Sequence, residues 1–228
     1  MILTNRLFER NSPSRDAKSI YIFCEGRRRE YDYFKYFKEK DSRINIEVHK
    51  IAADDNNSPE GLFDIAVNSI YPAEKNGNKP KYNIIEGDEV WIVIDTDPDK
   101  DNSRIEQIVE IKSECDKKQN WFVVESNPCF EVWLYYHQNN GLPDSLIPDT
   151  CNNWKTLVNQ IIIGGFDSRK HPIFIEEATN NAKSAHEENN NVLDSGYTEV
   201  YHLGTSIMTI LAEKIRLIKS KIVEKPLP

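Results

Sequence analysis

Short apolar runs of two kinds recur along the first half of the chain. Residues 18–24 and 43–51 alternate polar residues with β-branched and aromatic ones. Residues 89–95 form a nearly continuous apolar run, and residues 121–124 form a shorter one. Alternation is typical of a half-buried strand, whereas a continuous run is typical of the buried centre of a sheet. The pattern therefore predicts four strands.

Between these runs, apolar residues recur at spacings of three and four, which predicts helices. The expected helices cover residues 30–40, 58–70 and 101–118, and a fourth opens at Pro128. Ser58-Pro59 has the composition of a helix start, since proline suits the first helical position. The residues expected to face inward from the third helix are Ile105, Ile108, Val109 and Ile111.

The alternation of strands and helices over residues 18–140 predicts an α/β fold. Its sheet would be mainly parallel and covered by helices on both faces. Residues 1–17 are polar and are expected to form a flexible N-terminal arm. Residues 141–228 are expected to form a helical extension packed on this core. Its helices are predicted at residues 152–163, 172–189 and 199–223.

The last of these helices carries one apolar stripe, consisting of Ile207, Leu211, Ile215, Ile218 and Ile222. A single stripe is typical of a helix that buries one face. We expect this face to pack on the protein's own domain, and docking to a partner is the alternative.

Acidic residues follow two of the predicted strands. Glu25 comes directly after the first strand, and Asp95 and Asp97 end the third. Ligands of open α/β sheets bind at the carboxyl ends of the strands, so we expect the three carboxylates to face one pocket. Such carboxylates repel each other unless a hard cation such as Mg²⁺ lies between them. The alternative is that Asp97, with Asp99 and Asp101, forms turns and helix caps.

Glu131 lies in the first turn of the helix that opens at Pro128. The free N–H groups of a helix N-terminus suit a phosphate. Glu131 is therefore a candidate catalytic residue of the same pocket, and the alternative is that it offsets the helix dipole.

Basic residues near these carboxylates are candidate phosphate ligands. Arg27 and Arg28 directly follow Glu25-Gly26, and a guanidinium can bind a phosphate through two hydrogen bonds. Lys183 and His186 are three positions apart on a predicted helix and so share a face. They are candidates for contact with the substrate, and a surface role is the alternative. His137 has the character of a core or cap histidine.

Composition and charge argue against several classes of protein. The net charge of −8 argues against a protein that coats DNA tightly by itself, because basic side chains supply nonspecific affinity. No apolar stretch approaches the roughly 18 residues of a membrane helix, and no secretion signal is evident, so we expect a cytoplasmic protein. Its four scattered cysteines indicate reduced thiols, with Cys24 and Cys129 buried, rather than disulfides or a zinc site. No P-loop motif occurs.

Several motifs together resemble the RloB-like proteins, a family associated with bacterial and phage defence. The run from Ile20 to Gly26 is followed by Glu30, Tyr33 and Phe34. The segment from Ser126 to Leu134, with the pattern S-N-P-x-F-E-x-W, is the most specific part. One departure is Arg29, where the family usually has threonine.

RloB-like proteins look like relatives of the Toprim domain. The resemblance therefore implies that the sheet is of the Toprim or Rossmann-like type, and it also implies a function. It implies that Glu25, Asp95 and Asp97 bind Mg²⁺, with Mn²⁺ as the alternative ion. It also implies a nuclease effector of an antiviral system that acts on DNA or RNA. A partner ATPase of the ABC or AAA type is expected, and a homo-oligomer is an open possibility.

Two other functions stay open at this point. One is a noncatalytic Toprim-shaped scaffold, or a module that binds a nucleotide or nucleic acid, with a vestigial metal site. The other is a phosphatase or nucleotide hydrolase with the same metal chemistry. A vestigial site should not show metal binding that depends on Glu25, so such binding distinguishes a nuclease from the scaffold. Cleavage of oligonucleotides in preference to mononucleotides distinguishes a nuclease from the phosphatase or nucleotide hydrolase.

Overall fold

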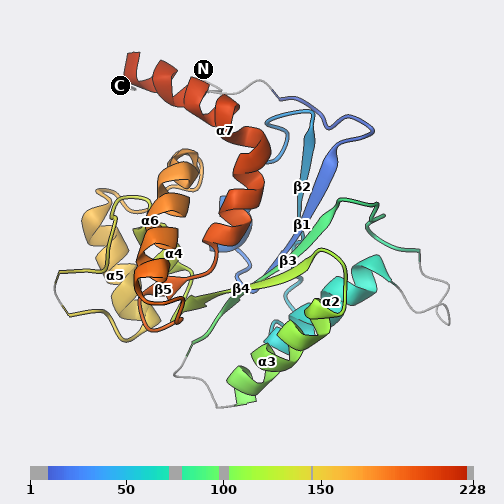
Figure 1. Ribbon diagram of the computed structural model, residues 1–228, viewed down its shortest axis with the longest axis horizontal. Helices are drawn as coiled ribbons and strands as arrows, with labels where there is room; N and C mark the ends of the chain where they lie inside the picture. Colours follow the sequence, from blue (N-terminus) through green and yellow to red (C-terminus); the bar gives the residue numbers. More distant parts are fainter. Residues whose placement is uncertain (1–9, 72–78, 98–102, 145, 225–228) are drawn as a thin grey trace.

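The computed structural model describes residues 10–71, 79–97, 103–144 and 146–224. Within these residues five strands form one sheet in the order β2-β1-β3-β4-β5 (Figure 1). β1 to β4 are parallel, and β5 runs antiparallel to β4. The strands are β1 (Lys18–Cys24), β2 (Ile44–Val48), β3 (Glu89–Asp95), β4 (Trp121–Asn127) and β5 (Tyr197–Thr198). The predicted α/β fold is confirmed.

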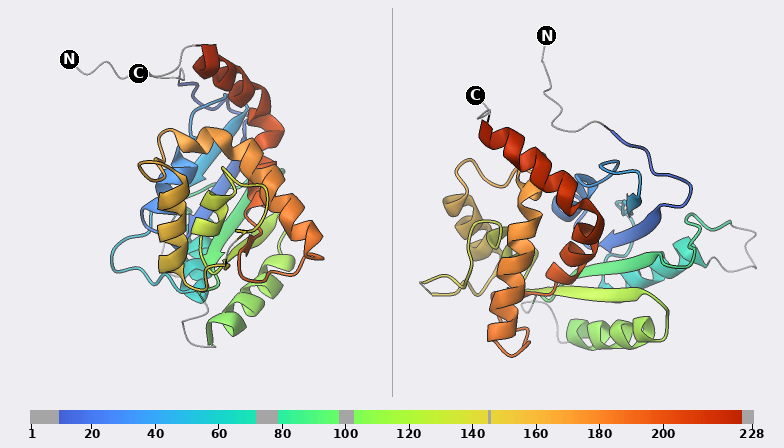
Figure 2. Two further views of the ribbon diagram at one scale, coloured as in Figure 1. Left: turned by 90° about the vertical axis from the view of Figure 1, so that its left-hand side faces the viewer. Right: turned by 45° about the horizontal axis from the view of Figure 1, so that its top comes forward.

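Helices cover both faces of this sheet. α2 and α3 lie on one face, and α7 lies on the other (Figure 2). The helices are α1 (Arg29–Lys35), α2 (Pro59–Ile70), α3 (Ser103–Asp116), α4 (Glu131–Tyr135), α5 (Cys151–Ile161), α6 (Ile175–Glu188) and α7 (Tyr201–Glu224). A short 3-10 helix, η2 (His171–Phe174), precedes α6. None of the described helices is both long and apolar enough to cross a membrane.

The alternation of side chains along β1 divides the interior into two cores. Ile20 and Ile22 face the core formed with α1, α4, α5, α6 and α7. Tyr21 and Phe23 face the smaller core formed with α2 and α3. Because successive side chains of a strand point to opposite faces, one buried strand supports both layers. The helical extension thus shares the larger core with the sheet.

Local signals in the sequence account for several element boundaries. The bounds of β1 and β3 coincide with the predicted strands. The Ser58 side chain caps α2 by accepting a hydrogen bond of 3.1 Å from the Gly61 N–H, as its sequence indicated. The first helix is shorter than predicted, because the chain turns after Lys35 and Glu39 adopts a positive φ of 58°.

The orientation of α3 differs from the prediction. Ile108 and Ile111 are buried as expected, but Ile105 and Val109 are 58% and 63% exposed. The buried stripe begins with Arg104 instead, four residues before Ile108. Since Arg104 pairs with Glu25, this ionic contact turns the neighbouring Ile105 towards solvent.

The fifth strand was not predicted. β5 has two residues, too few to show a period of two, and it lies directly before the helix that was expected to start at residue 199. It is held to β4 by backbone pairing and by a hydrogen bond of 2.7 Å between the hydroxyls of Ser126 and Thr198. This pairing attaches the helical extension to the edge of the sheet.

The last helix packs on its own domain, as predicted. Ile207, Leu211, Ile215 and Ile218 are all buried in the larger core. The side chain of Ile222 lies outside the described part of the chain.

Residues 10–17 run beside the loop before β2. The N–H groups of Asn11 and Ser14 donate to the carbonyls of Glu39 and Ser42, at 3.0 and 2.7 Å. The rest of the expected flexible arm, residues 1–9, lies outside the described residues.

Candidate active site

The site is built where β1 and β3 end side by side. The Glu25 N–H donates to the carbonyl of Val93, at 3.3 Å, which continues the pairing of the two strands. The Glu25 carboxylate in turn accepts a hydrogen bond of 3.5 Å from the backbone N–H of Asp95. Folding thus brings the acid after β1 directly to the Asp-x-Asp segment.

The end of β4 holds the Asp-x-Asp segment from its other side. The Thr96 and Asp97 N–H groups donate to the carbonyls of Ser126 and Pro128, both at 3.0 Å. The Thr96 hydroxyl donates to the Asn127 side chain, also at 3.0 Å. Asp97 has a φ of 43°, a left-handed conformation that aspartate tolerates better than most residues. Asp99 and Asp101 lie outside the described residues.

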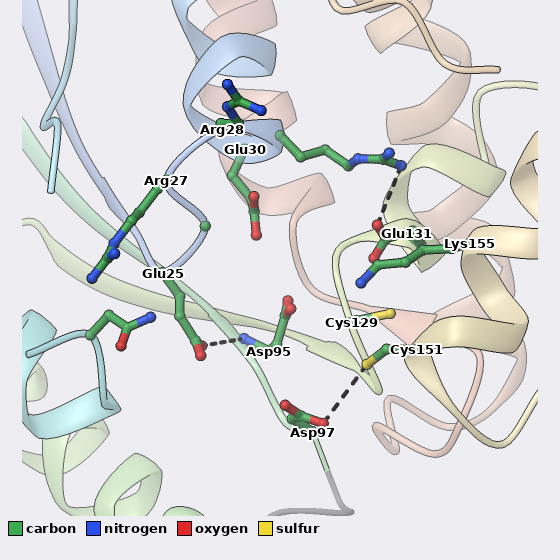
Figure 3. A pocket seen from close by; sticks show the side chains of 13 residues that line it. Glu25, Arg27, Arg28, Glu30, Asp95, Asp97, Cys129, Glu131, Cys151 and Lys155 are labelled. Atoms are coloured by element: carbon green, nitrogen blue, oxygen red, sulfur yellow. Dashed lines mark hydrogen bonds and ion pairs between the residues drawn. The ribbon is translucent and has the colours of Figure 1, made fainter. Parts of the chain in front are cut away.

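These strand ends open into a pocket of about 810 Å³ (Figure 3). Six of the residues predicted for the site line it, namely Glu25, Arg27, Arg28, Asp95, Asp97 and Glu131. Further lining residues that were not predicted for the site include Glu30, Cys129, Cys151 and Lys155. Acidic side chains from β1, β3, α1 and α4 therefore share one cavity.

Glu30 is the most perturbed acid that the sequence did not assign to the site. Its carboxyl packs on Gly26, where an added Cβ would lie 1.6 Å from Glu30 Oε2. Gly26 thus makes room for this carboxyl. Burial raises the pKa of Glu30 to about 7, and the nearby Glu131 and Glu25 add to the increase. Glu30 lies three positions before Tyr33 and four before Phe34, which places it on the buried face of the predicted helix. This placement was the signal in the sequence.

Asp95 lies among these like charges. Burial raises its pKa well above the ordinary value for an aspartate, and Glu30, Glu25 and Glu131 each raise it further. The common cause is an excess of acid in a space with little water. A bound cation would relieve this excess.

Arg104 is a second residue that the sequence did not assign to the site. Its guanidinium forms a buried ion pair with Glu25, and its Nε donates to the Asp95 carbonyl at 2.9 Å. One side chain from α3 therefore ties together the ends of β1 and β3. An arginine among the apolar residues of a helix gave little indication of this role.

The donor set suits a hard cation, although its geometry is not that of a formed metal site. Among the described residues, no three His, Cys, Asp or Glu side chains already have the spacing of metal ligands. Oxygen donors are nevertheless the ligands that Mg²⁺ prefers, and a nearby positive charge would stabilise the ionised form of Asp95, whose pKa is raised. Glu25, Asp95 and Asp97 therefore fit the ion, provided that their side chains reorient.

The basic residues of the pocket have different surroundings. Arg29 forms an ion pair of 3.3 Å with Glu131, whose buried carboxylate lines the pocket. Arg27 donates to the Ala53 carbonyl at 2.7 Å, on the side of α2. Lys155 reaches the pocket from α5 and lies beside Glu131 (Figure 3). Positive charge thus surrounds the acidic centre.

A comparison with protein families agrees with this arrangement of motifs. The family model described as RloB-like protein matches residues 20–207. This chain belongs to the RloB-like family. No curated protein and no solved structure matches it significantly.

The most specific motif of this RloB-like protein has a structural role at nearly every position. The Ser126 hydroxyl bonds to β5, and the Asn127 side chain joins Thr96 to the carbonyl of Leu193. Phe130 and Trp133 are buried in the larger core. The remaining acid of the motif, Glu131, faces the pocket.

Arg29, which departs from the usual family pattern, does not cap α1. The N-cap residue of that helix is Arg28, and its side chain makes no capping hydrogen bond. The contact that Arg29 makes is with Glu131, across the pocket. In this RloB-like protein position 29 thus contributes to the charge balance of the site.

Lys183 and His186 lie on α6 and are not among the residues that line the pocket. Lys183 is exposed and forms an ion pair of 3.7 Å with Glu187. His186 is 3% exposed, so the alternative of a surface role is wrong for this residue. Its Nδ1 is 3.1 Å from the Tyr201 hydroxyl, because the turn of α6 carries it towards α7.

The interpretation of His137 as a core or cap histidine is confirmed, since it is buried and contacts a carbonyl of α4. Its Nε2 is 3.1 Å from the Tyr33 hydroxyl, and its Nδ1 is 3.0 Å from the Trp133 carbonyl. Burial lowers its pKa to about 3, so the ring stays neutral near pH 7. It supports the aromatic core beneath the site.

The four cysteines are free thiols in the structure. Cys24 and Cys129 are buried, as their apolar surroundings predicted. Cys115 is also buried, whereas Cys151 is partly exposed.

Proposed function

We propose that this RloB-like protein is a Mg²⁺-dependent phosphodiesterase, a nuclease that acts in bacterial antiviral defence. The observation that supports the proposal best is the crowding of Glu25, Glu30, Asp95 and Glu131, together with Asp97, in one pocket. Bringing five carboxylates together, with Glu30 and Glu131 buried, costs free energy because like charges repel each other. Perturbed acids of this kind are frequent at catalytic sites.

The cation would be held by Glu25, Asp95 and Asp97, with Glu131 as an auxiliary residue. Bound Mg²⁺ lowers the pKa of a coordinated water and neutralises phosphate charge. The Arg104 side chain would keep the Glu25 carboxylate beside Asp95. The three carboxylates would reorient from these positions to hold the ion.

Glu30 is our candidate for the proton acceptor. A general base works best when its pKa lies near the working pH, and the pKa of Glu30 is raised to about 7. Arg27, Arg28 and Lys155 would bind phosphate oxygens at the rim. A guanidinium is well suited to this task because it can donate two parallel hydrogen bonds.

The defence role and the partners derive from the family resemblance. Acidic residues outnumber basic ones, which gives a net charge of −8, so the chain has no excess of positive charge with which to hold a long nucleic acid. We propose that an ATPase partner, of the ABC or AAA type, supplies further binding contacts to DNA or RNA. Assembly into a homo-oligomer would serve the same purpose by repeating the basic rim.

A second candidate function is a noncatalytic module that binds a nucleotide. The observation that favours it is the ion pair between Arg104 and Glu25, which already neutralises one of the proposed ligands. In that case a phosphate would bind Arg27, Arg28 and Lys155, and cleavage would not follow.

Cleavage of labelled DNA and RNA oligonucleotides in Mg²⁺ or Mn²⁺ tests the proposal. We expect activity in the wild type and a loss of at least about 100-fold in Glu25→Gln and Asp95→Asn. Glu106→Gln changes an exposed acid of α3 and is the matched control, which we expect to retain activity.

The assay is run with and without EDTA, with mononucleotides in parallel and with the partner ATPase where one is encoded nearby. Full activity in Glu25→Gln or Asp95→Asn contradicts the assignment. Hydrolysis of mononucleotides alone identifies a nucleotide hydrolase instead.

A further inference from the structure

Two cysteines distant in sequence meet in the wall of the pocket. Cys129 comes from the segment between β4 and α4, and Cys151 is the first residue of α5. Both residues line the pocket, and Figure 3 shows the two sulfur atoms side by side. A pair of adjacent thiols in a site can do chemistry that an isolated buried cysteine cannot.

The two thiols differ in their access to small molecules. Cys129 is buried, whereas Cys151 is partly exposed and lines the cavity. The Cys151 thiol also lies against the acidic centre, with its Sγ donating to Asp97 Oδ1 at 3.8 Å. An oxidant that enters the cavity would therefore reach Cys151 first and find Cys129 behind it.

The other two cysteines provide an internal comparison. Cys24 is buried in the larger core, on one face of the sheet, and Cys115 is buried in the smaller core, on the other. The sheet separates these two thiols from each other. Neither of them lines the pocket.

We propose that Cys129 and Cys151 form a reversible disulfide, so that the pocket carries an oxidant-sensitive modification site. When an accessible cysteine lies beside a second, shielded cysteine, its oxidation stops at a disulfide between the two. The proposal concerns the two thiols and stands whether or not the pocket cleaves nucleic acid.

Hydrogen peroxide is the co-reactant that we name. The Cys151 thiol releases its proton, its sulfur attacks one peroxide oxygen, and the O–O bond breaks. The departing hydroxide takes up that proton and leaves as water, so Cys151 becomes a sulfenic acid. The Cys129 sulfur then attacks the sulfenic sulfur, its S–O bond breaks, and the second water departs with the Cys129 proton. Two thiols are thus oxidised by two electrons, and one peroxide is reduced to two waters.

The disulfide would change the pocket in two ways. Cys151 would lose the proton that it donates to Asp97, so the aspartate would lose a hydrogen-bond donor. The start of α5 would also be joined covalently to the segment before α4. Reduction by a dithiol would restore both features.

The test is to treat the reduced full-length protein with a small excess of hydrogen peroxide, block free thiols and map the peptides by mass spectrometry without reduction. We expect a peptide that links Cys129 to Cys151, and a fall from four free thiols per chain to two. Dithiothreitol should restore all four. Cys115→Ser is the matched control and should still form the link.

Cys129→Ser supplies a second readout, because it removes the thiol that resolves the intermediate. In this variant we expect a sulfenic acid at Cys151 that dimedone traps. The proposal is overturned if wild-type Cys151 goes to sulfinic or sulfonic acid without the link. It is equally overturned if the first disulfide involves Cys24 or Cys115, or joins two chains.

Discussion

At the scale of single residues, the site is defined by acids that are buried together. Glu30 is the clearest case, because its pKa is raised to about 7 from an ordinary value of 4.5. The folded protein therefore holds this proton more tightly than the unfolded chain does. The contribution of Glu30 to stability is therefore greatest at acidic pH and is lost as the pH rises from about 4.5 through about 7.

Glu30→Gln should remove this loss of stability at higher pH, because glutamine does not ionise. We expect its free energy of unfolding at pH 8 to exceed that of the wild type by roughly 1–3 kcal/mol, since one pKa unit corresponds to about 1.4 kcal/mol. At pH 5 the two proteins should agree within about 0.5 kcal/mol. Urea unfolding at both pH values measures the difference, with Glu106→Gln as the exposed control. A variant equally stabilised at both pH values would show that ionisation of Glu30 is not the cause.

Arg104 and Glu25 form a buried ion pair whose contribution to stability can be measured. Breaking a buried ion pair leaves one charge without a partner, which costs about 3–5 kcal/mol. We expect Arg104→Met to destabilise the protein by an amount of this order, and Arg104→Met with Glu25→Gln to recover much of the loss. A double-mutant cycle in urea measures the coupling. Additive effects of the two substitutions would contradict a direct contact.

At the scale of elements, the main strands and the start of α2 could be predicted because their signals are local. β1 and β3 are marked by their own apolar runs, and α2 by Ser58 and Pro59. The direction in which α3 faces could not be predicted, since it depends on Arg104 meeting an acid from another strand. β5 was missed for the same reason, because two residues become a strand only by pairing with β4.

The last helix provides a test at this scale. Leu211 is fully buried in the larger core, whereas Leu217, on the same helix, is 52% exposed. We expect Leu211→Ala to lower the free energy of unfolding by about 2–5 kcal/mol, because it leaves a cavity. Leu217→Ala should change it by less than about 1 kcal/mol. Thermal and urea unfolding provide the measurement, and equal effects would contradict the packing of α7 on its own domain.

At the scale of the whole molecule, the pocket lies where the sheet meets the helical extension. The acids that end β1 and β3 could be predicted, because parallel strands bring their carboxyl ends to one edge. Cys151 and Lys155 come from α5, and their place in the wall depends on how the extension packs. Long-range packing of this kind leaves no local pattern. This is also why Lys183 and His186 shared a predicted helix but lie away from the pocket.

The central claim is that Glu25, Asp95 and Asp97 together hold a divalent cation. Calorimetric titration of the purified protein with Mn²⁺ at pH 8 tests it most directly, with Glu25→Gln, Asp95→Asn and the control Glu106→Gln in parallel. We expect saturable binding in the wild type and the control. In the two site variants, binding should be weakened at least about tenfold, a loss of about 1.4 kcal/mol or more. Binding of equal strength in all four proteins, or none in the wild type, would contradict it.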